Sequence, residues 1–342
     1  MIPRPWLPLA VCAGLLCTAS ARADDDAAAA REWLARMSEA LSTSNYDGRF
    51  THRTVRQSET LRIVHRVEDG RSVERLVSLD GNGREIIRRQ DEVHCYLPDR
   101  RQVLVKPRRD EGSLAGSLPG DTPELAEHYR VSIRSGLRLL ERDVRLIEIM
   151  PRDRYRYGYR LWLDERTAMP LRSIVCDADG RTIEQIQFTS LEVGRPIAAS
   201  EIEPGVTAEG FAWVREKPGS DAATAADIPW HAKRLPPGFR LVQRSLQRMP
   251  GANDPAQHLV FSDGLASISV FIESRVRRSA AATEPTLIGA SSAFSTQVGS
   301  HLVTVVGEAP PETVRDVASS MAPTGSAPGS DAFAPRALAP GP

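Results

Sequence analysis

The chain has 342 residues, and its 44 lysines and arginines balance its 44 aspartates and glutamates, so the formal net charge is zero. Basic and acidic residues are interleaved along most of the chain, which gives no field of one sign and argues against a nucleic-acid partner. After Asp24, no apolar run approaches the roughly 20 residues that a membrane-spanning helix needs.

The first residues have the layout of a cleaved secretory signal. Arg4 is followed by an apolar run from Trp6 to Thr18, and Ala21-Arg22-Ala23 then precedes three acidic residues. We therefore predict that residues 1–23 form a signal peptide and that the mature protein is exported to the periplasm.

Residues 24–200 are predicted to form a large N-terminal domain. An amphipathic helix is expected over 27–43, where Leu34, Met37 and Leu41 recur at helical spacing. From 46 to 192, short runs rich in Val, Ile, Tyr and Phe are separated by turn residues, which predicts a meander of antiparallel strands. Residues 110–141 interrupt this pattern with Gly, Ser and Pro, and we expect one or two short helices in the stretch LAEHYRVSIRSGLRLLERD, residues 125–143.

The stretch 154–163 carries two alternating rows of side chains. One face of the predicted strand holds Tyr155, Tyr157, Tyr159, Leu161 and Leu163, and the other holds Arg154, Arg156, Arg160 and Trp162. Because the arginines are expected to face water, the tyrosine row is expected to face the interior of the sheet. Tyrosine suits both a packed core and the wall of a lipid-lined cavity, and the pattern leaves both open.

The second half of the chain is predicted to hold a separate domain. Residues 201–227 are rich in Gly, Pro, Ala and Ser and read as a linker, and a smaller β-rich domain follows over 228–323. It includes a hairpin at 258–273 with Asp263-Gly264 at its turn, and a helix that begins after Pro310 and Pro311. Residues 324–342 cannot bury enough apolar surface to order themselves and are predicted to be disordered. The expected fold class is α+β with mostly antiparallel strands.

The sequence contains no recognisable catalytic or metal-binding motif. Its seven histidines lie singly, without spacings typical of metal sites, and no phosphate-binding glycine loop or nucleophile elbow occurs. We therefore predict no catalytic residue, no metal site, no cofactor and no enzymatic activity. A protein of this kind is expected to bind a partner or ligand, on the concave face of a curved sheet or at exposed strand edges.

The predicted mature chain keeps two cysteines, Cys95 and Cys176. An oxidising compartment permits a disulfide between them. Two buried free thiols are the alternative, and the sequence leaves both open.

Five stretches carry a resemblance to a known family. They are WLARMSEALSTSNYDGRFTH near the start, YRLWLDERTAMPLRS in the middle, and LPPGFRL, HLVFSDGLASISVFIE and VVGEAPPETVRDVA in the second domain. Through them, residues 28–323 resemble the RseB/MucB family, whose members are periplasmic negative regulators of the envelope-stress sigma-E (AlgU-type) factor. The second-domain stretches are the more specific, because the middle stretch is shared with lipoprotein-carrier-like domains.

The resemblance implies a large half-open β-barrel with helices, similar to the lipoprotein carriers LolA and LolB, and a smaller C-terminal β-rich domain. It also implies that the protein binds the periplasmic segment of a RseA/MucA-type membrane anti-sigma factor and shields it from regulated proteolysis. Release is expected when a lipid or lipopolysaccharide-type stress ligand binds. Regulators of this family can self-associate, so a homo-oligomer is expected as well.

The resemblance and the alternating rows together suggest binding residues. The ligand cavity is predicted to be lined by Tyr157, Tyr159 and Leu161. The partner is predicted to bind the second domain at Pro237, Phe239, Phe261 and Phe271.

Two other functions remain open at this point. A periplasmic lipid or lipoprotein carrier would have a carrier-like N-terminal domain but would not need the second domain. An enzyme acting on envelope components would need a cleft that gathers histidines and carboxylates, which sequence separation does not reveal.

Overall fold

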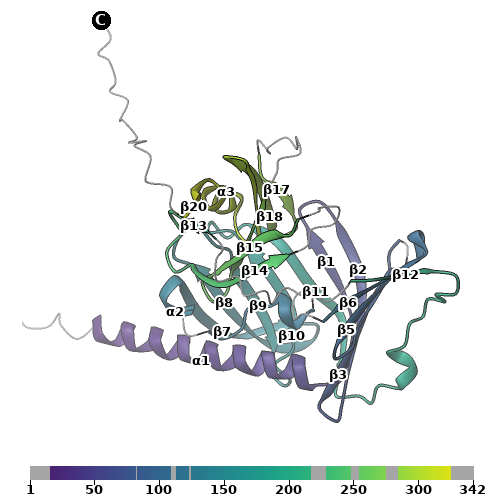
Figure 1. The fold of residues 1–342 in the computed structure, drawn as a ribbon. Coiled ribbons are helices and arrows are strands. Elements are labelled where there is room, and N and C mark those ends of the chain that lie inside the picture. Colours follow the sequence, from purple (N-terminus) through teal and green to yellow (C-terminus); the bar gives the residue numbers. More distant parts are fainter. Residues whose placement is uncertain are drawn as a thin grey trace, which may run out of the picture.

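The computed structural model describes residues 16–81, 83–108, 113–122, 125–216, 229–247, 254–274 and 284–324. These residues form two β-sheet units that pack against each other (Figure 1). The N-terminal unit holds a twelve-stranded sheet, and the C-terminal unit holds a six-stranded sheet and a two-stranded ribbon. No helix in the described part of the chain is long and apolar enough to cross a membrane.

The N-terminal sheet is built mainly from consecutive hairpins, as strand-forming runs between turn residues predict. Its helices and strands are α1 (Leu16–Thr43), β1 (Tyr46–Thr54), β2 (Ser58–Glu68), β3 (Arg71–Ser78), β4 (Glu85–Arg88), β5 (Glu92–Leu97), β6 (Gln102–Pro107), α2 (Leu125–His128), β7 (Tyr129–Leu139), β8 (Arg142–Pro151), β9 (Gly158–Asp164), β10 (Pro170–Cys176), β11 (Thr182–Val193) and β12 (Ala212–Arg215). Single 3₁₀ turns lie at η1 (Pro98–Arg100), η2 (Ala115–Ser117) and η3 (Ala199–Glu201).

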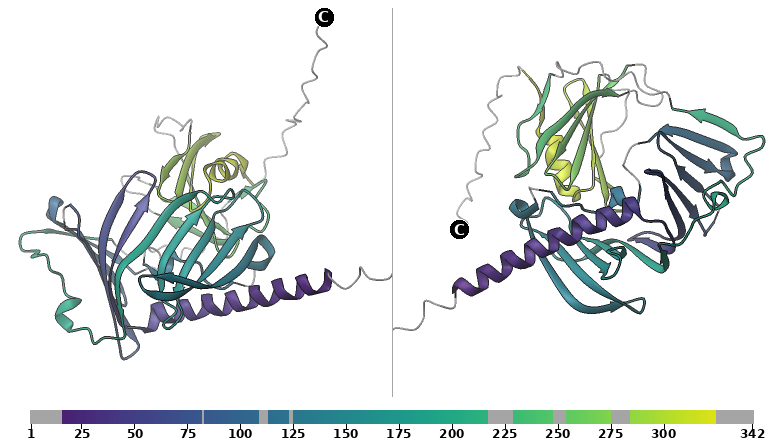
Figure 2. Two further views of the ribbon diagram at one scale, coloured as in Figure 1. Left: turned by 180° about the vertical axis from the view of Figure 1, so that it is seen from behind. Right: turned by 90° about the horizontal axis from the view of Figure 1, so that it is seen from below.

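The strand order is β12-β6-β5-β4-β3-β2-β1-β11-β10-β9-β8-β7. Every neighbouring pair is antiparallel except β12 and β6, which run parallel. The outermost strands β12 and β7 are not paired with each other, so the strongly curved sheet stays open (Figure 2). The predicted half-open sheet with mostly antiparallel strands is confirmed.

Helix α1 packs on the inner face of this sheet. Trp33, Leu34, Met37 and Leu41 are buried in one core that also contains Phe50, Ile63, Ile147, Tyr159 and Leu161. Each fully buried leucine or methionine contributes about 1.5–3 kcal/mol relative to an exposed one. The helix begins at Leu16, inside the predicted signal peptide of residues 1–23, and cleavage after Ala23 stays a prediction.

Strand β7 corrects the expectation of short helices at 125–143. Only α2 is helical there, and the chain continues as β7, which forms one edge of the sheet. In β7 the residues Val131 and Ile133 pack against the main core, whereas Arg130 and Arg134 are exposed. This alternation has the period of two that a strand requires, and β-branched residues favour it.

Strand β12 lies inside the range 201–227 that was predicted to be a linker. After β11 the chain crosses the outer face of the sheet, and Ile197 and Ile202 pack there on Val64. Beyond this strap, which we define as residues 194–211, β12 pairs with β6. Residues 217–228 of the predicted linker lie outside the described residues, as do residues 325–342 of the predicted disordered tail.

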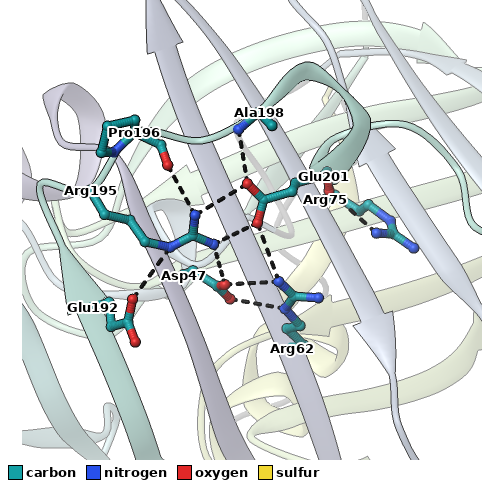
Figure 3. Close-up of polar contacts among 8 residues, drawn as sticks. All are labelled: Asp47, Arg62, Arg75, Glu192, Arg195, Pro196, Ala198 and Glu201. Carbon is teal, nitrogen blue, oxygen red and sulfur yellow. Dashed lines mark hydrogen bonds and ion pairs between the residues drawn. The ribbon is translucent and has the colours of Figure 1, made fainter.

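A network of charged side chains fixes the strap to β1 and β2 (Figure 3). Asp47 of β1 accepts hydrogen bonds from Arg62 at 2.8 Å and from Arg195 at 2.5 Å. Arg195 also donates to Glu201 at 2.6 Å, and Glu201 accepts the backbone N–H of Ala198 at 2.8 Å. The Arg195 guanidinium and this N–H lower the pKa of Glu201 to about 2. The strap is therefore held by paired charges rather than by apolar burial alone.

The structure contradicts the disulfide between Cys95 and Cys176, because both thiols are free. Cys95 lies in β5 and Cys176 in β10, and five strands separate these two in the sheet. Neighbouring strands lie about 4.8 Å apart, whereas a disulfide needs Cα atoms within about 7 Å. Burial raises the pKa of both thiols.

The C-terminal unit is the separate, smaller β domain that was expected. Its elements are β13 (Trp230–Ala232), β14 (Arg240–Gln247), β15 (Ala256–Ser262), β16 (Ser267–Ser274), β17 (Thr286–Ile288), β18 (Ser291–Val298), β19 (His301–Gly307), α3 (Pro311–Ser320) and β20 (Met321–Pro323). The six-stranded order is β14-β15-β16-β19-β18-β17, and β13 pairs with β20. Helix α3 begins at Pro311, within one residue of the predicted start, and packs Val314 and Val317 against this sheet. Ile268, Val270 and Ile272 of the predicted hairpin face the same core.

The strap network predicts a pH-dependent stability. We expect Glu201→Gln to lower Tm by roughly 2 °C near neutral pH, since about 1 kcal/mol shifts Tm by a few degrees in a chain of this size. The folded-state pKa of Glu201 is depressed, so its contribution is present above the ordinary value of 4.5 and is lost as pH falls towards 2. Thermal melts of both proteins across this range should therefore converge in acid.

Glu192→Gln is the matched control, because Glu192 contacts the same Arg195 at 3.4 Å but its side chain is 74% exposed. Exposed ion pairs contribute little, so its Tm should stay near that of the unmodified protein. Equal Tm losses in both variants at every pH would contradict this role for Glu201.

Candidate functional site

The tip of the β15–β16 hairpin meets the N-terminal domain through one buried carboxylate. Asp263 Oδ1 accepts the backbone N–H groups of Leu265 at 2.9 Å and Ala266 at 2.7 Å, which closes the turn. Asp263 Oδ2 accepts hydrogen bonds from Arg156 Nη1 at 2.5 Å and from the Tyr129 hydroxyl at 3.1 Å. The residue predicted only to set the turn therefore also joins the two domains.

Arg156 is the cation at the centre of this junction, and its side chain has no exposed surface. Its guanidinium also donates to Asp153 at 3.0 Å and to the carbonyl oxygen of Pro237 at 2.5 Å. The rings of Tyr129 and Phe239 lie 5.7 and 5.2 Å from its central carbon. Two carboxylates and a carbonyl thus compensate the loss of water around the buried charge.

The buried Arg156 corrects the expectation that this arginine faces water and that Tyr155 faces inward. Strand β9 begins only at Gly158, so residues 152–157 form a loop between β8 and β9, and strand alternation does not apply to them. Tyr155 is 38% exposed. From Tyr159 onward the prediction is confirmed, because Tyr159, Leu161 and Leu163 face the core.

Leu265, at the tip of the same hairpin, packs against the core of the N-terminal domain. Thr313, at the start of α3, donates a hydrogen bond to the backbone carbonyl of Tyr155 at 3.0 Å. The buried Tyr157 hydroxyl interacts with Ser292 of β18. The hairpin tip, α3 and β18 therefore all contact the β8–β9 loop.

A second contact between the domains lies at the β17–β18 turn. Glu184 of β11 accepts the backbone N–H of Ala290 at 2.9 Å, and its other oxygen lies 2.9 Å from His52 Nε2. Gly289 makes this approach feasible, since a Cβ atom there would lie 2.6 Å from Glu184 Oε2. Burial raises the pKa of Glu184, but the hydrogen bonds from His52 and Ala290 outweigh it and lower that pKa. Glu184 in turn raises the pKa of His52.

The three residues predicted to line a ligand cavity are all buried. Tyr159 and Leu161 lie in the main core, and Tyr157 lies at the domain junction. Two depressions of about 470 and 610 Å³ lie on the sheet beside the strap and share Arg71 and Val73, and neither is lined by these three residues. A cavity at Tyr157, Tyr159 and Leu161 stays a prediction.

The residues predicted to bind the partner divide into two groups. Phe239 and Phe261 are buried in the core of the C-terminal domain. Pro237 is exposed, and Phe271 is half-buried on the sheet face away from α3, where its ring stacks on His258 at 4.4 Å. Only Pro237 and Phe271 are thus accessible in this structure, and their role stays a prediction.

Sequence reasoning missed Arg156 and Tyr129 as site residues. Pro151 and Asp153 precede Arg156 and are turn-forming residues, so they could have indicated a loop there. Nothing in the sequence places Tyr129 beside Asp263, because the contact joins two domains. The described residues contain no group of three or more histidine, cysteine or acidic side chains that could hold a metal.

The contact between His52 and Glu184 predicts a pH-dependent stability. The folded-state pKa of His52 is raised, so its stabilisation is complete below the ordinary value of 6.5 and is lost as pH rises through the raised pKa. We expect His52→Asn to lower Tm more at about pH 6 than at about pH 9. An equal loss at both pH values in calorimetric melts would contradict an ion pair with Glu184.

Two family models match this chain, one for each domain. The family model for the MucB/RseB N-terminal domain matches residues 29–206, and the model for the MucB/RseB C-terminal domain matches residues 224–322. The sigma factor AlgU regulatory protein MucB of Pseudomonas aeruginosa is 32% identical over 306 residues, which cover 88% of this chain and 93% of that protein. The sigma-E factor regulatory protein RseB of Escherichia coli K12 is 27% identical over 321 residues, covering 92% and 97%.

Solved structures agree with these matches. MucB in complex with MucA(peri) is 31% identical, with a TM-score of 0.66 over 86% of this chain and 99% of that one. MucB alone is 30% identical, with a TM-score of 0.58 over 86% and 98%. The matches span both domains and nearly the whole length of the relatives, and this chain belongs to the MucB/RseB family.

Proposed function

We propose that this protein is a periplasmic regulator that binds the periplasmic segment of a MucA/RseA-type membrane anti-sigma factor. The observation that carries the proposal is the match of both domains to MucB solved in complex with MucA(peri). The predicted secretory signal supports a periplasmic location. Bound in this way, the protein shields the segment from regulated proteolysis and so keeps the sigma factor inactive.

The accessible face of the second domain is the proposed partner surface. Its centre is the row formed by His258, Phe271 and Thr304 on neighbouring strands. All three are half-buried and lie on the side away from α3. An aromatic side chain on such a face is the kind of residue that anchors an interface.

Release is proposed to follow from a lipid or lipopolysaccharide-type ligand. A ligand displaces the partner only to the extent that it prefers the arrangement that the partner does not bind. The domain junction is the element that could differ between two such arrangements, because it joins the domains through a few buried polar contacts. We also propose that the protein self-associates into a homo-oligomer, which can be tested on the same purified protein.

Calorimetric titration of the mature chain, residues 24–342, with the periplasmic segment of its host's anti-sigma factor tests the proposal. Binding, together with slower cleavage of the segment by its protease, is the expected result. Absence of binding would favour the alternative of a periplasmic lipid or lipoprotein carrier.

Phe271→Ala is expected to weaken this binding roughly tenfold or more, as truncation of an aromatic anchor does. Val55→Ala is the matched control, since Val55 is an apolar residue that is 81% exposed in the N-terminal domain. The proposed surface is wrong if both variants bind the segment as tightly as the unmodified chain.

A further inference from the structure

The hairpin tip presents two different groups to the N-terminal domain within three residues. Asp263 places a carboxylate on Arg156 and Tyr129, and Leu265 places an apolar side chain against the core to which Tyr129 belongs. An anion joined to an apolar group is the chemistry of an anionic amphiphile. The N-terminal domain therefore already binds a carboxylate and an adjoining apolar group, both supplied by its own chain.

The receiving site is polar at one end and apolar at the other. Asp153, in the same β8–β9 loop, also binds the Arg156 guanidinium, so Arg156 is held in position by its own domain even without Asp263. Burial raises the pKa of the Tyr129 hydroxyl, which keeps it protonated as a hydrogen-bond donor. A guanidinium and a hydroxyl that converge on one oxygen form an anion site, and Tyr159 and Ile149 belong to the core next to it.

We propose that the Asp263–Leu265 tip is an intramolecular competitor for a site that binds an anionic amphiphile. The ligand's carboxylate or phosphate would take the place of the Asp263 carboxylate on Arg156 and Tyr129, and its acyl chain would take the place of Leu265. Because the tip belongs to the second domain, ligand binding would undock that domain at the junction. This inference rests on the proposed release by a lipid-type ligand, and it names the site and the competing segment.

Two substitutions separate this competition from a merely structural contact. Asp263→Asn keeps the Oδ1 acceptor that closes the turn but removes the charge that competes for Arg156, so the amphiphile should bind more tightly. Arg156→Gln removes the receiving cation, so the amphiphile should bind more weakly. A purely structural pair would give changes of the same sign in both variants, since each loosens the same junction.

The experiment is calorimetric titration of the mature full chain with dodecyl phosphate below its micelle concentration. We expect Asp263→Asn to tighten binding about tenfold and Arg156→Gln to weaken it about tenfold. Dodecyl maltoside has the same alkyl chain but no charge, so it should bind the unmodified protein more weakly than dodecyl phosphate does. Only in Arg156→Gln should the two amphiphiles bind with similar affinity. Inorganic phosphate alone should not bind measurably, which separates an amphiphile from a free anion.

Asp179→Asn is the matched control, because Asp179 also precedes a glycine in a turn but is 53% exposed; it should leave the titration unchanged. Circular dichroism shows whether each variant folds. If Arg156→Gln does not fold, Tyr129→Phe replaces it in the comparison and is expected to weaken binding severalfold. The inference would be overturned if Asp263→Asn and Arg156→Gln changed the affinity for dodecyl phosphate in the same direction. It would also be overturned if the unmodified protein bound the charged and uncharged amphiphiles equally well. No partner segment is present in these titrations, so this failure is distinct from failure of the anti-sigma factor to bind.

Discussion

The buried ion pair between Arg156 and Asp263 is the contact on which the arrangement of the two domains depends. Both side chains are withdrawn from water, and each is costly to bury without the other. The same carboxylate closes the β15–β16 turn, so the local geometry of the hairpin and the docking of the domains share one group. A substitution of Asp263 would therefore affect the β15–β16 turn, the loop before β9 and the docking of the second domain at the same time.

The local pattern of the chain predicted most of the elements that surround this pair. Helical spacing of Leu34, Met37 and Leu41 predicted the buried face of α1, and alternation predicted the inward face of Tyr159 and Leu161. The Asp-Gly turn of the hairpin was also predicted. These features depend on residues close together in sequence, where periodicity and turn chemistry act directly.

Contacts between distant segments could not be predicted in this way. Alternation was extended through Arg156, although the strand starts only at Gly158, and so a junction residue was assigned to solvent. The parallel pairing of β12 with β6 and the strand separation of Cys95 from Cys176 depend on the course of the whole sheet. The composition of residues 201–227 and the family resemblance both predicted two domains, but neither predicted the residues at which the domains meet.

The position of β1 in the sheet has a consequence for how the chain folds. β1 joins β2 on one side and β11 on the other, so the first strand of the domain pairs with the last strand of its hairpin series. The strands β2–β6 and β7–β11 can each form by local hairpin closure, whereas the β1–β11 seam closes a loop that contains nearly the whole domain. High contact order of this kind slows folding. Until the β1–β11 seam closes, the chain exposes the free edges of β1 and β11. This interval is therefore the one in which the protein is most open to misassociation.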